Sequence, residues 1–246
     1  MGLDIRTIQK KLEKLQNKGK EVKESAFWKP EDGTHEVRIL PTPDGDPFKE
    51  YWFHYNVGNM GVMCPKRNFG EECPICEFAT KLFTEGDEES VSMAKELFVR
   101  QRFCSPILVR GDEKTGVKVW SYSKTVYEEL LKTVLDPDYG DITDLDNGFD
   151  LKVEKGKFSG ARYSTMKVKP KPKSTPMCKD TESKECKELL DSIPDFTTLF
   201  QRMSSKEVQL VLDKHLATPD EDSVGLEKGG SKVENAVDAA IRELEL

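Results

Sequence analysis

The 246-residue chain has little of what membrane and exported proteins need. Only 36% of its residues are hydrophobic, 34% are charged, and no stretch approaches the roughly 18–20 consecutive apolar residues of a membrane span. The N-terminus lacks the short apolar run of a secretory signal. We therefore expect neither a membrane protein nor an exported one, with weakly ordered segments beside a packed core.

Cysteine and histidine are also scarce. Three histidines leave no convincing Ser/His/Asp or Cys/His set, and no phosphate-binding GxxxxGK[ST] or GxGxxG motif occurs, so neither a hydrolase nor a nucleotide-driven motor is indicated. Six cysteines are too few and too unevenly placed for a disulfide scaffold. In a reducing compartment we expect them to be thiols or metal ligands: Cys64, Cys73, Cys76, Cys104, Cys178 and Cys186.

Charge is unevenly distributed along the chain, whose net charge is -7. Between Lys152 and Lys179, nine basic residues face one acid, Glu154, which gives this segment a charge of +8. Residues 217–246 carry eight acids and three bases, a balance of -5. A basic stripe is a candidate polyanion track and an acidic tail a candidate competitor or partner-docking segment, although either run can be plain solvated surface.

The sharpest chemical pattern is Cys64-x8-Cys73-x2-Cys76. A two-residue spacer lets both sulfurs reach one ion, as in half of a zinc site. The nearest fourth ligand is His54, with His35 and Cys104 as weaker candidates. Metal binding would order a stretch poor in apolar residues. Buried free cysteines and a redox CPxC motif are the alternatives, although the redox motif needs a βαβ context that is not evident here.

Periodicity predicts an α+β chain. We expect TEGDEES to be an exposed loop, 91–100 to be a helix or a strand lead-in, and KPKPKSTP to interrupt regular structure. We expect a hairpin turn at Asn147–Gly148. A calcium loop is disfavoured there, because the glycine comes one position too early for the calcium-loop pattern. A short amphipathic helix is expected from residue 3 to about residues 17–19. Further helices are expected at 74–83, 126–135, 185–193, 204–215 and 233–244, and strands at 35–40, 51–57, 103–109, 117–122, 149–153 and 161–168.

Basic and aromatic residues alternate on three of these strands. Single-stranded nucleic acid needs this combination, since phosphates attract Lys and Arg while unstacked bases stack on rings. The alternative for each ring is a place in the core. The candidate DNA-binding residues are Arg100, Arg102, Phe103, Trp120, Tyr122, Lys155, Lys157, Arg162, Tyr163 and Lys167.

The order of these parts resembles the single-stranded DNA-binding (helix-destabilising) protein of T-even-like bacteriophages. The similarity lies in the basic arm, the strand ending in His54, the cysteine cluster, VRQRFCSPILV, KVWSYSK, NGFDLKV with its basic hairpin, and the acidic tail. It implies an OB-fold core with a zinc-binding subdomain. It also implies one structural zinc on His54, Cys64, Cys73 and Cys76.

The resemblance further implies a division of labour along the chain. Residues 1–24 would be an N-terminal helical arm for self-association along DNA, 25–216 the DNA-binding core with the zinc subdomain at about 54–83, and 217–246 the acidic tail that binds replication and recombination proteins. The function implied is non-enzymatic, sequence-independent coating of single-stranded DNA in phage replication, recombination and repair, in the cytoplasm of the infected bacterial host. A zinc-ribbon interaction module without DNA affinity and a thiol or zinc redox enzyme are the alternatives.

Overall fold

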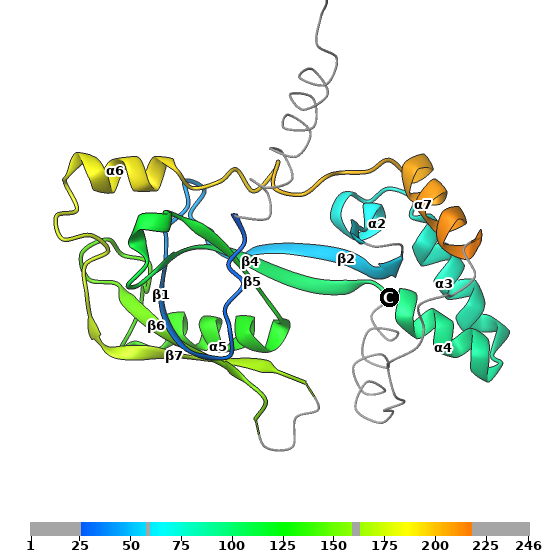
Figure 1. The fold of residues 1–246 in the computed structure, drawn as a ribbon, viewed down its shortest axis with the longest axis horizontal. Helices are drawn as coiled ribbons and strands as arrows, with labels where there is room; N and C mark the ends of the chain where they lie inside the picture. Colours follow the sequence, from blue (N-terminus) through cyan, green and yellow to red (C-terminus); the bar gives the residue numbers. More distant parts are fainter. Residues whose placement is uncertain (1–25, 58–59, 159–162, 218–246) are drawn as a thin grey trace, which may run out of the picture. The chain divides into compact units, whose positions relative to one another are not determined.

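A computed structural model describes residues 26–57, 60–158 and 163–217 (Figure 1). The expected arm and tail helices lie outside these residues. The chain forms two compact units. The first holds the described residues up to Tyr51 together with Gln101–Gln201, and the second holds Trp52–Arg100 and the described residues from Arg202 onward.

The first unit is built on antiparallel strands. Strand β4 pairs with β1 and also with β5, and both pairings reach Ile107, so β1 and β5 lie on opposite edges of β4. Beyond β1 follow β6 and then β7. The α+β class with a mainly antiparallel sheet is confirmed. The bounds are β1 Gly33–Ile39, β4 Arg100–Val109, β5 Lys118–Tyr122, β6 Phe149–Gly156 and β7 Thr165–Ser174.

One face of this sheet forms the main core. Alternate residues of a strand point to opposite faces, and Val37, Val153 and Val168 lie in the core cluster. Helix α5 (Lys124–Leu135) contributes Val126 and Leu130 to the same cluster. Its helical spacing was predicted from the sequence, and the burial of both residues confirms the prediction.

Two expectations about the segments after β6 are wrong. The segment KPKPKS does not interrupt regular structure, because β7 runs through it as the last strand in the sheet order. Proline is tolerated on such an edge, where its missing N–H costs no ladder hydrogen bond. Cys178 and Cys186 are not free thiols but form a disulfide, with Cys186 in helix α6 (Lys184–Asp191).

A buried ionic network lies at one end of this sheet. Arg38 is fully buried and donates a 2.9 Å hydrogen bond to Asp150, which also accepts from Arg110. The loop before β6 closes over it, and a Cβ at Gly148 would lie 2.4 Å from Arg38 Nη1. Gly148 therefore lies in this packed loop and not in the predicted two-residue hairpin turn, since its N–H donates to the carbonyl of Asp144.

The second unit combines a hairpin with helices. The expected exposed loop TEGDEES is largely helical: α3 extends to Glu85, and Asp87 caps the next helix by accepting from Ser90 N–H. No helix in the described ranges is long and apolar enough to cross a bilayer. The bounds are β2 Lys49–Val57, β3 Met60–Met63, α2 Pro65–Phe69, α3 Pro74–Glu85, α4 Glu88–Leu97 and α7 Ser205–Ala217.

Candidate metal centre and nucleic-acid interface

His54 lies on β2, where it pairs with Val62 of β3. The hairpin returns the chain toward His54 and delivers Cys64 directly after β3. A register shift follows His54, and Asn56 there adopts a left-handed φ of 61°, a conformation that Asn tolerates better than most residues. The local fold thus places the imidazole and the first thiol side by side, as the sequence spacing predicted.

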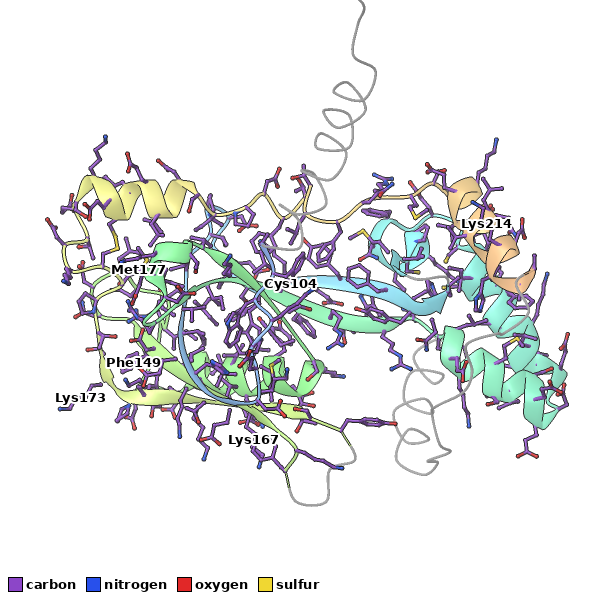
Figure 2. All side chains as sticks on the ribbon, viewed as in Figure 1. Cys104, Phe149, Lys167, Lys173, Met177 and Lys214 are labelled. Atoms are coloured by element: carbon purple, nitrogen blue, oxygen red, sulfur yellow. A yellow bond between two sulfur atoms is a disulfide. The ribbon has the colours of Figure 1, made fainter. Side chains whose placement is uncertain are left out.

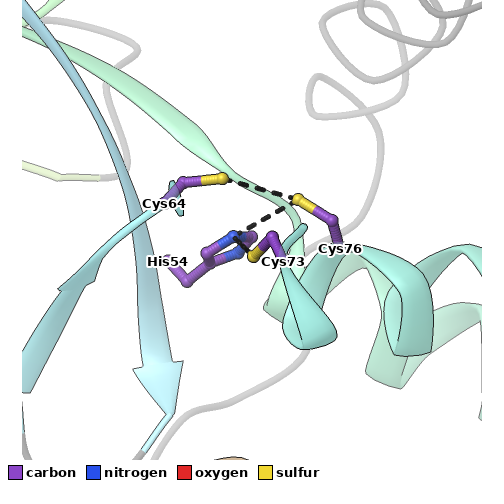
Figure 3. Close-up of side chains that lie close together, drawn as sticks. All are labelled: His54, Cys64, Cys73 and Cys76. Carbon is purple, nitrogen blue, oxygen red and sulfur yellow. Dashed lines mark hydrogen bonds between the residues drawn. The ribbon is translucent and has the colours of Figure 1, made fainter. Parts of the chain in front are cut away.

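The other ligands come from helix starts. Cys64 is the N-cap of α2 and Cys73 the N-cap of α3, each followed by a proline at the first helical position. Proline fits there because that N–H has no partner within the helix. Cys76 lies in the first turn of α3, so Cys73 and Cys76 face the same point (Figure 3).

The four ligand atoms lie within 4.8 Å of one another. His54 Nε2 is 3.4 Å from Cys73 Sγ and 3.5 Å from Cys76 Sγ, and Cys64 Sγ is 3.5 Å from Cys76 Sγ. A tetrahedral zinc ion with ordinary bond lengths would separate its ligands by about 3.6 Å (N to S) and about 3.8 Å (S to S). These three separations are within a few tenths of an ångström of the ideal values and all pairs lie within 4.8 Å, so the cluster can close around one zinc ion with small shifts of its side chains.

Burial and hydrogen bonding prepare these groups for a metal. His54, Cys64 and Cys73 have no exposed surface. His54 Nδ1 donates to the carbonyl of Leu97 at 2.8 Å, which leaves the Nε2 lone pair directed at the thiols. Hydrogen bonds with Cys73 and Cys76 lower the pKa of Cys64, whereas hydrogen bonds with Cys64 and Cys73 raise the pKa of Cys76, so Cys64 is the thiol that ionises first and Cys76 would lose its proton to metal binding.

Sequence reasoning missed three residues beside this cluster, Trp52, Lys66 and Arg67. The guanidinium of Arg67 lies 5.4 Å from the ring centre of Trp52, two residues before His54. Arg67 and Lys66 also line a small cavity with His54 and Cys76. The sequence contains a signal for these residues, because Trp52 stands two residues before His54 in YWFHY, and CPKRN carries two basic residues directly after Cys64. These residues give the second unit a cation and a ring of its own.

The structure places three of the predicted DNA-binding rings in the core. Phe103, Trp120 and Tyr122 are at most 2% exposed and belong to the main cluster. Tyr122 also shares a 2.6 Å hydrogen bond with Ser105. A base cannot stack on a ring enclosed in this way. Their assignment as base platforms is corrected here to core packing.

Most of the exposed candidates lie on the β6–β7 hairpin. Tyr163 is 61% exposed, and Lys157 and Lys167 are exposed on the two sides of the same connection. Lys167 Nζ lies 4.0 Å from the ring centre of Phe158, whereas Lys155 donates to the carbonyl of Pro30. Arg162 lies outside the described residues. Arg100 is exposed and Arg102 half-buried at the start of β4.

Comparison with known proteins identifies the family of this arrangement. The family model described as gp32 DNA binding protein like matches residues 31–217. The chain belongs to this gp32-like family. The match contains the whole His/Cys cluster and the basic hairpin, and membership supports single-stranded DNA binding. No curated protein matches the sequence.

Proposed function

We propose that this gp32-like protein coats and protects single-stranded DNA without sequence preference during phage DNA replication, recombination and repair, and that it is not an enzyme. One observation carries the proposal: the DNA-binding family match spans both the metal cluster and the exposed hairpin. On that hairpin, a ring at Tyr163 and ammonium groups at Lys157 and Lys167 supply the two contacts that single strands need.

The metal in this proposal is one structural zinc ion. Four protein ligands would leave no open coordination position, whereas catalytic zinc keeps one for water or substrate. Zinc would hold β2, α2 and α3 of the second unit together. This argument disfavours the redox enzyme, because Cys73 and Cys76 would be engaged as ligands together with His54 and Cys64.

The chain ends complete the proposal. Residues 1–24 would mediate self-association along DNA, and the acidic residues of 217–246 would bind replication and recombination proteins. Both assignments rest on charge and on resemblance. The protein would act in the cytoplasm of the infected bacterial host.

The test is fluorescence anisotropy of labelled oligo-dT titrated with the protein at two salt concentrations. We expect binding that weakens as salt rises, because phosphate contacts release counterions. Tyr163→Ala should weaken binding, since one stacked base contributes about 1–3 kcal/mol, with little change in the salt slope. A protein that does not bind oligo-dT would instead be the zinc-ribbon interaction module.

A further inference from the structure

The β6–β7 ladder places lysines opposite one another. Lys152 pairs directly with Lys169, and Glu154 with Lys167. Cross-strand partners and alternate residues share a face of a sheet, so Lys171 lies on that face too, as its ion pair with Glu36 of β1 confirms. The opposite face carries the core residues. The lysine face is defined as Lys152, Lys167, Lys169 and Lys171.

The charge on this face is positive in an acidic protein. Its carboxylates are Glu154, which accepts from Lys152 at 2.6 Å, and Glu36, which accepts from Lys171 at 2.9 Å. Four lysines against two glutamates leave two positive charges, whereas the whole chain carries -7. A hydrogen bond from Lys152, helped by the charges of Lys169 and Lys167, lowers the pKa of Glu154, as a positive local potential requires.

The arrangement is unfavourable in the unliganded protein. Like charges directly opposite each other on neighbouring strands destabilise a sheet, and Lys152 and Lys169 are such a pair. Within the described part of the chain, Lys169 forms no ion pair of its own, whereas Lys152 and Lys171 each form one, so only the charge of Glu154 partly offsets this repulsion. A bound polyanion would remove the repulsion.

The chemistry of the face favours duplex DNA over a single strand. The residues assigned to it in the described strands are Lys, Glu, Thr34 and Thr165, without a ring for a base to stack on. Phe158 is nearest, but its ring already lies under the ammonium group of Lys167. Phosphate contacts alone position a nucleic acid without reading or unstacking its bases, which suits paired strands.

The lysines extend over a length comparable to a few base pairs of a duplex. Alternate residues of a β-strand are about 6.8 Å apart, so Lys167, Lys169 and Lys171 span about 14 Å, which equals about four base-pair steps of B-DNA at about 3.4 Å of rise along the helix axis. In Figure 2, Lys167 and Lys173 extend outward from this part of β7. We propose that Lys152, Lys169 and Lys171 of the lysine face bind the phosphate backbone of duplex DNA, separately from the single-strand contacts that Lys157, Tyr163 and Lys167 would make.

The experiment compares two triple variants of the full chain. Lys152→Gln/Lys169→Gln/Lys171→Gln removes the lysines of the face that lie away from the hairpin tip. Lys132→Gln/Lys184→Gln/Lys187→Gln removes the same charge from surface ion pairs elsewhere in the first unit. Binding to a labelled blunt duplex and to oligo-dT is measured between 50 and 200 mM salt, with melting temperature and oligomeric state as checks on folding.

We expect the face variant to lose about 0.9 per contact from the duplex salt slope, about 2.7 in all. Raising the salt from 50 to 200 mM should then weaken duplex binding of this variant by a factor about 40 times smaller than the factor for wild type. The face variant should keep the wild-type salt slope on oligo-dT, and the control variant should keep the wild-type slopes on both DNAs. Replacing the same three lysines by arginine should preserve duplex binding.

Three results would overturn the proposal. Unchanged duplex binding with new self-association would mean that the lysines only protect the edge strand β7. Equal losses on duplex and oligo-dT would place the face within the single-strand site. Tighter oligo-dT binding with unchanged duplex binding would indicate that the lysine face binds the acidic tail and not duplex DNA. Wild-type protein that binds duplex through the face but ignores oligo-dT would refute the proposed function and leave this inference standing.

Discussion

At the residue scale, Cys64 and Cys73 pack in the core of the second unit, but the role proposed for their thiols is to bind the metal. Cys73→Ala should abolish stoichiometric zinc and lower the melting temperature, because the binding free energy of a structural ion is also folding free energy. Metal content by plasma emission and thermal unfolding are the measurements. The control is Cys104→Ala, a buried free cysteine outside the cluster, which should keep one zinc per chain. Zinc retained by Cys73→Ala at an unchanged melting temperature would show that the ligand assignment is wrong.

Rings in the core and rings at the surface should respond differently to truncation. Trp120→Ala should cost about 3–5 kcal/mol of the free energy of unfolding, since the side chain is fully buried. Tyr163→Ala should leave that free energy nearly unchanged and weaken oligo-dT binding. Urea unfolding and anisotropy titration separate the two effects. Normal stability with lost DNA binding in Trp120→Ala would return this ring to the interface.

The local ligand pattern was predictable at this scale and the fate of the rings was not. Cys73 and Cys76 are three residues apart, so the first turn of one helix fixes their geometry whatever the rest of the chain does. Whether Trp120 faces base or core depends on which strand covers it, and its contact with Trp28 joins residues far apart in sequence. In the sequence, an aromatic residue near lysines has the same pattern whether its ring stacks on a base or packs in the core.

At the scale of elements, the loop before β6 is fitted around a buried arginine. Gly148→Ala should destabilise the protein by about 1–3 kcal/mol, because the new Cβ would lie 2.4 Å from both Arg38 Nη1 and the carbonyl oxygen of Asp144. Gly156→Ala is the matched control, since nothing lies within 4 Å of a Cβ there. Equal stabilities of the two variants, measured by urea unfolding, would contradict this account of the loop.

The same network makes stability depend on pH. Burial raises the pKa of Asp150, but hydrogen bonds and charges of Arg110 and Arg38 outweigh burial and hold it below its ordinary value. A carboxyl with a depressed pKa in the folded state stabilises fully above its unfolded pKa, about 3.9, and loses that contribution as pH falls through the folded pKa. The free energy of unfolding should therefore decline below about pH 4.

Asp150→Asn tests this origin. The variant should lose about 3–5 kcal/mol at neutral pH, because it leaves Arg38 buried without its charge partner, and it should show a weaker decline in acid. Asp191→Asn, on an exposed helix end, is the control. An acid profile of Asp150→Asn parallel to that of wild type would assign the acid sensitivity to other groups.

Elements with strong internal periodicity were predicted closely, and those shaped by their neighbours were not. Helix α5 follows from the spacing of Val126 and Leu130 in the core cluster. Strand β7 continues through Pro170 because its pairing with β6 places that proline opposite Leu151, and no local rule reveals this pairing. Likewise, Asp87 starts α4 as its N-cap within a run that composition alone assigns to a loop.

At the scale of the whole molecule, net charge and charge distribution act in opposite directions on DNA binding. Residues 218–246 carry eight acids and three bases, so their removal changes the net charge from -7 to -2 while α7, which ends at Ala217, stays intact. If these acids compete with phosphates for the basic hairpin, the truncated chain should bind oligo-dT more tightly, most strongly at low salt where screening is weakest. A full-length variant with Asp220, Glu221 and Asp222 replaced by Asn, Gln and Asn should show part of the gain. Affinity at low salt that is equal or weaker after truncation would exclude competition and leave the tail with partner binding alone.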